Sequence, residues 1–290
     1  MMQNPSVFML GHGSRDATAI REFEQFVDHF RQRMQGWQIG YGFLEFARPT
    51  IREGLAKMVA DGATAIECLP GMLFAASHVK NDLPAVLHEF SHRNPQLRLR
   101  MGRELAIDGK LLRAAADRIE QAIDQADAAS PHPIDRKDTV LMVIGRGTSD
   151  PDANGNVAKI SRMLSEGLGF GWSEYGYSGT ATPRTAAALA HAVKLGYRRI
   201  LVFPYFLFGG ILVDRIRAET DEIRRLNPAI EIIDVPYLGP HPLVIEAFID
   251  RLREIDRGEN LMNCQLCKYR TRILGYDAEV GAPQQTHHHD

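Results

Sequence analysis

The sequence predicts an α/β protein built from two duplicated lobes, each a parallel sheet covered by helices on both faces, with a loosely ordered C-terminal tail. Short apolar runs typical of strands alternate with longer helix-like segments through most of the 290 residues. The same succession of motifs also occurs twice at a constant spacing, which indicates duplication.

The internal repeat is clearest from a Tyr-Gly pair onward, where residues of the first copy recur 134 positions later. The matched pairs are Tyr41 and Tyr175, Pro49 and Pro183, Gly62 and Gly196, Pro70 and Pro204, and Phe74 and Phe208. Upstream, each half begins with an apolar run, then Gly-x-Gly and a hydroxyl residue. A constant offset over roughly 35 positions favours a duplicated unit over chance.

Within each half, apolar periodicity separates strands from helices. The first half predicts strands at 6–10, 39–45, 65–69 and 97–101, and helices at 16–35, 50–61, 79–92 and 109–126. The second half predicts strands near 140–144, 175–180, 199–203 and 230–235. The strict alternation implies parallel sheets of the flavodoxin-like kind.

Local signals support these boundaries. Pro49 and Pro183 suit the first turn of a helix, where a missing N–H costs little. Gly62 and Gly196 suit the turn that follows that helix. The predicted organisation is an N-terminal lobe at 1–129, a polar linker at 130–138, a C-terminal lobe at 139–257 and a tail at 258–290.

Composition points to a cytoplasmic enzyme or small-molecule binder. The 34 Lys and Arg residues against 36 Asp and Glu give a net charge of −2, so no basic excess indicates nucleic acid. No apolar run approaches the roughly 18 residues that span a bilayer, and no basic residue precedes Arg15 as a signal peptide would require. Three cysteines cannot build a disulfide framework.

Chemistry-bearing side chains follow three predicted strands of the N-terminal lobe. His12 stands between two glycines after the first strand, Glu45 follows the second, and His78 follows the third. Ligands of parallel α/β sheets bind outside the carboxyl ends of the strands, so these side chains should converge. Imidazole suits divalent cobalt, nickel, iron and zinc, and a carboxylate can bind metal or accept protons.

Each feature also has a plainer explanation. Gly11 and Gly13 can simply form a tight turn, and a histidine beside a helix start can be a solvated or capping residue. Glu45 can pair with Arg48. The convergence of three distant segments on one sheet edge favours a site over these alternatives.

The three segments together resemble the sirohydrochlorin chelatases of the class II chelatase superfamily, most closely the long-form cobaltochelatases of the CbiX type. The motifs are His-Gly-Ser-Arg after the first strand, Phe-Leu-Glu-Phe-Ala-Arg-Pro at the second and Leu-Pro-Gly-Met-Leu-Phe-Ala-Ala-Ser-His-Val at the third. The resemblance covers both halves and the tail. It implies chelatase-like lobes that insert Co²⁺ into sirohydrochlorin without ATP, in cobalamin (corrinoid) biosynthesis.

The resemblance also assigns roles to particular residues. It makes His12 and His78 the metal-binding histidines and Glu45 the acidic residue beside them, with all three catalytic. Sirohydrochlorin is a polycarboxylate, so polar and basic residues near the cleft are candidates for binding it. These candidates are Ser14, Arg15, Arg48, Lys80, Arg146 and Arg184. For each basic residue, an ordinary surface charge is an equally good explanation.

The second half lacks the same chemistry. Arg146 stands where the first half has His12, Gly179 where it has Glu45, and Leu212 where it has His78. We therefore expect catalysis in the N-terminal lobe. The C-terminal half, with a degenerate second site, is expected to close the cleft and bind substrate carboxylates, with Arg146 as the candidate residue.

The tail contains Cys264 and Cys267 in a C-x-x-C motif, which in the resembled family is associated with an iron–sulfur centre. Such a cluster usually needs four thiolates, and Cys68 lies in a predicted core strand. A cluster would therefore need a homodimer or other ligands; zinc, a dithiol switch or no function are the alternatives. His287, His288 and His289 form either a metal-holding run or a tag remnant.

Two classes of function follow from these features. The first is a sirohydrochlorin chelatase, for cobalt or alternatively for iron or nickel, since the ligands suit all three metals. The second is a tetrapyrrole or metal carrier without turnover. Glu45 favours the enzyme, because a carrier needs no proton acceptor.

Overall fold

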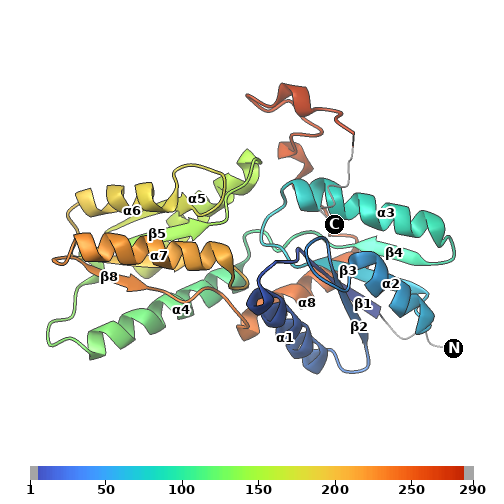
Figure 1. Ribbon diagram of the computed structural model, residues 1–290, viewed down its shortest axis with the longest axis horizontal. Helices are drawn as coiled ribbons and strands as arrows, with labels where there is room; N and C mark the ends of the chain where they lie inside the picture. Colours follow the sequence, from blue (N-terminus) through green and yellow to red (C-terminus); the bar gives the residue numbers. More distant parts are fainter. Residues whose placement is uncertain (1–5, 284–290) are drawn as a thin grey trace. The chain divides into compact units, whose positions relative to one another are not determined.

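The computed structural model describes residues 6–283 and contains two four-stranded parallel sheets with helices on both faces, which confirms the predicted α/β class (Figure 1). The first sheet has the strand order β2-β1-β3-β4 and the second has the order β6-β5-β7-β8. Identical orders in the two sheets are what the duplication predicts. In both sheets, the first strand of the unit lies between its second and third strands. The order of the strands reverses direction between the first and the third.

Among the described residues, the first unit comprises 6–106 and 245–283. Its strands are β1 (Ser6–Gly11), β2 (Gln38–Phe43), β3 (Ala65–Pro70) and β4 (Arg98–Met101). Its helices are α1 (Ala17–Arg33), α2 (Ile51–Ala60), a π-helical turn (His78–Asp82), α3 (Leu83–Arg93) and most of α8 (Pro242–Arg257).

Alternating side chains of β1 fill both faces of this first sheet. Phe8 and Leu10 belong to one core cluster with side chains of α2 and α3, including Leu55 and Leu87. Val7 and Met9 are equally buried and point to the other face by strand alternation. A strand that is apolar on both sides is what a doubly covered parallel sheet requires.

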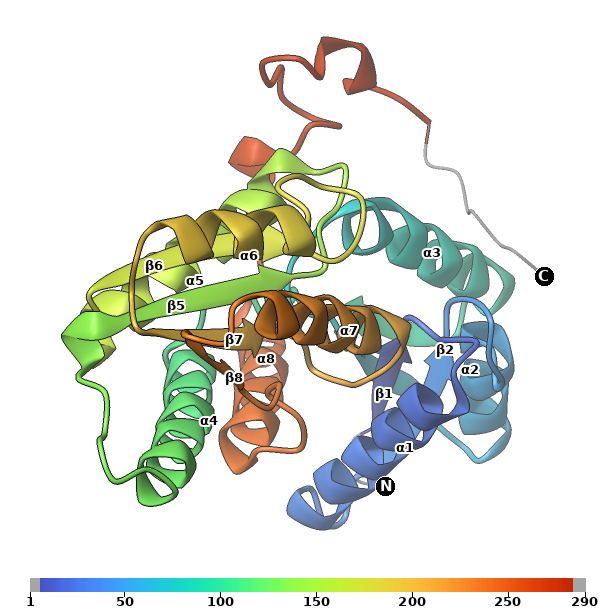
Figure 2. The same ribbon diagram turned by 60° about the vertical axis from the view of Figure 1, so that its left-hand side comes forward.

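The second unit comprises residues 107–244. Its strands are β5 (Thr139–Gly145), β6 (Trp172–Tyr177), β7 (Arg199–Pro204) and β8 (Glu231–Asp234). Its helices are α4 (Gly109–Ala128), α5 (Pro151–Leu168), α6 (Thr185–Lys194) and α7 (Ile211–Leu226). Figure 2 shows α6 and α7 lying side by side over one face of this sheet, and α4 packs with α5 and β8.

The contacts divide the chain differently from the predicted lobes at 1–129 and 139–257. Helix α4 follows the last strand of the first sheet in sequence, yet it packs in the second unit, where Arg199 pairs with Asp127 of α4. Helix α8 follows the last strand of the second sheet, yet Phe248 stacks on Phe26 of α1 at 4.9 Å between ring centroids. Each unit is thus completed by the helix that the sequence assigns to the other half.

Some predicted boundaries also shift. Pro49 and Pro183 lie before the helix caps rather than in the first turn. Thr50 caps α2 through a capping box with Glu53, and Arg184 is the N-cap residue of α6 without a side-chain cap. Both prolines follow cis peptide bonds, so the two repeats share this geometry as well. Strand β6 ends at Tyr177, three residues earlier than predicted. Gly62 is in the predicted position after α2, with φ of 97°.

The described part of the tail contains two short 3₁₀ turns, Cys264–Leu266 and Asp277–Glu279. Asn260 donates a hydrogen bond to the Met101 carbonyl at 2.8 Å, and Met262 packs against the core of the first unit. His287, His288 and His289 lie outside the described residues. Among the described residues, none of the helices is long and apolar enough to cross a membrane.

Candidate metal-handling site

Three loops at the carboxyl edge of the first sheet bring His12, Glu45 and His78 together. His12 directly follows β1, Glu45 lies two residues beyond β2, and His78 begins the π-helical turn after β3. Because β1 lies between β2 and β3, the ends of these strands are neighbours. One ligand atom from each side chain lies within 4.8 Å of the others, the only such group of three among residues 6–283.

The loop of His12 is locked to the loop of Glu45. The Glu45 amide donates to the His12 carbonyl at 3.0 Å, which fixes the separation of the two loops. Between them, Gly13 has φ of 93°, and a Cβ placed on it would lie 1.7 Å from the Glu45 carbonyl oxygen. A glycine is therefore required here both by the backbone angle and by the close approach.

His78 is fixed by a buried carboxylate on its own helical turn. Its Nδ1 lies 2.6 Å from Asp82 Oδ2, and the Asp82 side chain is 1% exposed. Asn81 Nδ2 donates to the other carboxylate oxygen, Oδ1, at 2.8 Å. The His78 ring is thus held at Nδ1, and its Nε2 faces His12.

The hydrogen bonds determine where the imidazole protons sit. His12 Nδ1 lies 2.9 Å from the Gly13 carbonyl, and His78 Nδ1 faces Asp82. Carbonyl and carboxylate oxygens only accept hydrogen bonds, so both Nδ1 atoms carry the proton in the neutral rings. Each ring then presents its lone pair at Nε2.

The two Nε2 atoms face each other at 3.2 Å, and Glu45 Oε1 lies 3.4 Å from His12 Nε2. Two lone pairs and a carboxylate oxygen at this separation repel one another unless a proton or a metal cation lies among them. Neutral imidazoles with one carboxylate suit a borderline divalent ion. The histidine side chains remain about a quarter exposed, so a ligand can reach them.

The residues predicted to bind substrate lie in different environments. Ser14 Oγ accepts from the Asp16 amide at 3.0 Å in the turn before α1, and the Arg15 guanidinium carbon lies 4.7 Å from the centre of the Phe46 ring. Arg48 pairs with Glu53 at 3.2 Å, so the alternative pairing of Arg48 with Glu45 is wrong.

Of the other predicted residues, Lys80 lies on the third of the site loops, and Arg146 lies in the second unit. Lys80 is buried on the turn that begins at His78 and lines a pocket of about 180 Å³. The other lining residues come from that turn and from the tail: Asn81, Met262, Asn263, Cys264, Cys267, Tyr269, Arg270 and Ala282. Arg146 is an exposed residue after β5 in the second unit.

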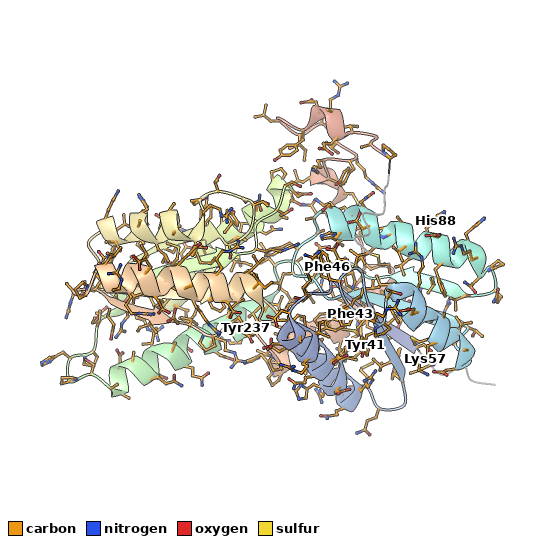
Figure 3. All side chains as sticks on the ribbon, in the orientation of Figure 1. Tyr41, Phe43, Phe46, Lys57, His88 and Tyr237 are labelled. Carbon is orange, nitrogen blue, oxygen red and sulfur yellow. The ribbon has the colours of Figure 1, made fainter. Side chains whose placement is uncertain are left out.

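Two residues of the site are absent from the predictions. Phe46, labelled in Figure 3, is 37% exposed beside His12, with 6.5 Å between ring centroids and φ of 62°. Non-glycine residues rarely adopt this angle, and such strain collects at functional sites. Asp82 is the other, and its spacing of four residues after His78 on a helical turn was the available signal.

The second unit keeps the loop geometry without the ligands. Gly147 has φ of 77°, and the Gly179 amide donates to the Arg146 carbonyl at 2.6 Å, as Glu45 does to His12. A Cβ on Gly179 would lie 2.3 Å from that carbonyl oxygen. The duplicated framework is retained, whereas no imidazole or carboxylate stands at the matching positions.

The tail cysteines do not fit a four-thiolate iron–sulfur cluster within one chain. In the described part of the chain, neither Cys264 nor Cys267 belongs to a group of three metal-binding side chains. Cys68 is fully buried in β3, and burial together with the Glu67 charge raises the pKa of its thiol, so it stays protonated. The donor set therefore falls two thiolates short.

Comparison with known proteins agrees with this architecture. The CbiX family model matches residues 6–122 and 140–255. A sirohydrochlorin cobaltochelatase of Priestia megaterium is 31% identical over 93% of this chain and 86% of its own length. A sirohydrochlorin ferrochelatase of Bacillus subtilis is 29% identical over 86% of this chain and 91% of its own length.

A solved structure is also similar. SirB from Bacillus subtilis, determined with Fe³⁺, superposes with a TM-score of 0.75 at 28% identity, covering 89% of this chain and 99% of SirB. The family model matches both halves of the chain, and similarity to the relatives extends through most of its length. The chain therefore belongs to the CbiX family.

Proposed function

We propose that this protein is a sirohydrochlorin chelatase that inserts Co²⁺ into the metal-free macrocycle without ATP, in cobalamin biosynthesis. The observation that carries the proposal is the meeting of two imidazole Nε2 atoms and one carboxylate, all within 4.8 Å. The similarity to the cobaltochelatase of Priestia megaterium supports the substrate and the metal.

In this proposal, His12 and His78 present Co²⁺ through Nε2 while their Nδ1 protons stay hydrogen-bonded. Two neutral imidazoles bind a divalent ion less tightly than four macrocycle nitrogens, so the ion can be handed over. The free-base macrocycle loses its N–H protons as the metal enters, and Glu45, whose Oε1 lies 3.4 Å from His12 Nε2, is the proposed proton acceptor.

The macrocycle would lie against the partly exposed ring of Phe46, beside His12. Arg15, which covers the Phe46 ring, can pair with a peripheral carboxylate of the substrate. Ser14, Arg48, Lys80 and Arg146 are the other polar side chains proposed to hold substrate.

Two alternatives share these observations. Iron or nickel suits the same ligands, and the Bacillus subtilis relative named as a ferrochelatase is nearly as similar as the cobaltochelatase. A carrier without turnover would use the histidines alone. The position of Glu45 within 3.4 Å of His12 Nε2 favours an enzyme.

The test is chelation by His12→Ala, His78→Ala and Glu45→Gln, followed through the visible spectrum of sirohydrochlorin. We expect the alanine variants to lose at least about tenfold in rate at limiting Co²⁺, because each removes one ligand. Glu45→Gln keeps an oxygen ligand but accepts no proton, so it should retain Co²⁺ binding and lose rate.

His191→Ala is the matched control, since His191 is an exposed histidine on α6 of the other unit. Wild-type chelation rates in all three site variants would contradict the proposal. If the wild-type protein metallates only one sirohydrochlorin per chain, the protein is a carrier. Parallel rates with Co²⁺, Fe²⁺ and Ni²⁺ decide the metal.

A further inference from the structure

We infer that Asp82 is a positioning residue that holds the His78 ring with Nε2 directed at the metal. The inference rests on the proposed function, because it needs His78 to be a metal ligand. It adds a group that makes no contact with metal or macrocycle in the proposed reaction and acts through His78.

The first support is the geometry of the carboxylate. Asp82 Oδ2 accepts the Nδ1 proton of His78 at 2.6 Å, and Oδ1 accepts from Asn81 Nδ2 at 2.8 Å. With both oxygens engaged, the carboxylate cannot rotate without breaking a hydrogen bond. The imidazole plane is consequently fixed, and its second nitrogen lies 3.2 Å from His12 Nε2.

The second support comes from the duplication. The residue of the second unit that matches Asp82 is Ile216, a core side chain of α7 that is 1% exposed. The residue that matches His78 is Leu212. In the second unit, which has no histidine to support, this position therefore holds an apolar side chain. The packing of the fold does not by itself require a carboxylate at this position.

The third support is the local backbone. His78 and Asp82 lie at the two ends of a π-helical turn, whereas the matching segment of the second unit lies in the regular α-helix α7. A π-turn is a rare departure from α-helix that occurs mostly at functional sites. A buried carboxylate on a rare turn, bonded to a site histidine, is costly for stability and useful for chemistry.

The experiment measures Co²⁺ affinity directly, by titrating the full-length protein with Co²⁺ alone and following the visible absorption of the bound ion. We expect Asp82→Ala and Asp82→Ile to weaken Co²⁺ binding by about 10- to 100-fold, as loss of the group that orients a metal-binding histidine typically does. Asp82→Asn keeps an oxygen that accepts the Nδ1 proton. Its Co²⁺ affinity should therefore lie between those of the wild type and Asp82→Ala.

Thermal unfolding separates this role from a structural one. Asp82→Ile copies the residue of the second unit, so its Tm should equal or exceed that of the wild type while Co²⁺ binding is weakened. A lower Tm with unchanged Co²⁺ affinity in the Asp82 variants would overturn the inference.

A double-mutant cycle with His78→Ala completes the test. If Asp82 acts through His78, Asp82→Ile should have no further effect on Co²⁺ affinity in the His78→Ala background. An equal loss in both backgrounds would show that Asp82 acts elsewhere and overturn the inference. If His78→Ala itself leaves Co²⁺ affinity unchanged, the proposed function fails; if only Asp82→Ile leaves it unchanged, the positioning role alone fails.

Discussion

At the scale of single residues, the site depends on positions where only one residue type fits. Gly13 allows the His12 and Glu45 loops to interlock, because any Cβ would overlap the Glu45 carbonyl oxygen. Phe46 adopts a left-handed backbone angle on the second of these loops. The close approach at Gly13 and the strained backbone of Phe46 lie on facing loops, which indicates that this backbone is shaped to hold the side chains between them.

The first prediction concerns this close approach. Gly13→Ala should lower the free energy of unfolding by about 2–4 kcal/mol, because it combines an unfavourable φ with overlap of backbone atoms. It should also weaken Co²⁺ binding, since the His12 and Glu45 loops must move apart.

Gly62→Ala is the matched control, because Gly62 has φ of 97° and open space around it. It should cost about 1 kcal/mol, from the backbone angle alone, and leave Co²⁺ binding unchanged. Urea unfolding and Co²⁺ titration of both variants check the prediction; equal effects would mean that the interlocked loops are not needed.

At the scale of secondary structure, two helix starts place histidine side chains in different roles. The π-helical turn before α3 holds His78 and Asp82, and the start of α8 uses another histidine as a cap. His241 Nδ1 accepts from the Leu243 amide at 3.2 Å, and its Nε2 lies 3.4 Å from Asp117 Oδ2. This second histidine caps a backbone amide, in contrast to His78, whose Nε2 faces His12 at the candidate site.

The second prediction is a pH dependence of stability. Burial, and then the nearby Arg118 charge, lowers the pKa of His241 below its usual 6.5, although Asp117 partly opposes this. The unfolded chain therefore takes up the proton first as the pH falls. The contribution of His241 to stability is complete above the unfolded pKa and is lost as the pH falls through the lowered folded pKa.

His241→Asn keeps a capping oxygen and does not titrate. As the pH falls from 7.5 to about 5, we expect the Tm of the wild type to decrease more than the Tm of His241→Asn. Parallel Tm curves across that range would contradict the assignment. His191→Asn, at an exposed histidine, serves as the control.

At the scale of the whole molecule, each sheet is completed by a helix from the other half of the sequence. Phe248, Leu252 and Ile255 of α8 are buried in the first unit. Two ion pairs tie the same helix to that unit: Arg103 to Glu254 and Arg100 to Asp256, both at 2.8 Å. The first unit therefore needs α8, which ends at residue 257, to be complete.

The third prediction follows from this exchange. A fragment of residues 1–129 should fail to unfold cooperatively, because it lacks α8 and exposes the apolar face that α8 covers. A chain that ends at Gly258 should fold and chelate metal, because it keeps both sheets and the His12, Glu45 and His78 group.

Circular dichroism, thermal unfolding and single-turnover chelation check both chains. The chain ending at Gly258 loses the Asn260 hydrogen bond and the Met262 contact, so a small decrease in Tm is expected. A fragment 1–129 with cooperative unfolding would contradict the role of α8. A folded but inactive chain ending at Gly258 would place a required group in the tail.

The sequence by itself determines the α/β class, the duplication and the three side chains of the candidate site. These depend on apolar periodicity, on a constant offset between the halves, and on the rule that parallel strands present their carboxyl ends at one edge. All three can be recognised in the sequence without knowing which elements pack together. His12, Glu45 and His78 could be chosen from sequence because each lies within a few residues of a strand end.

The tertiary structure decides which sheet each helix covers and how the site is oriented. The apolar stripes of α4 and α8 suit either sheet, so only packing assigns α4 to the second unit and α8 to the first. In the same way, His78 becomes a directed ligand only where a π-helical turn brings Asp82 to its Nδ1. Both outcomes depend on contacts made in three dimensions, and local sequence patterns carry no information about which partner a buried face will meet.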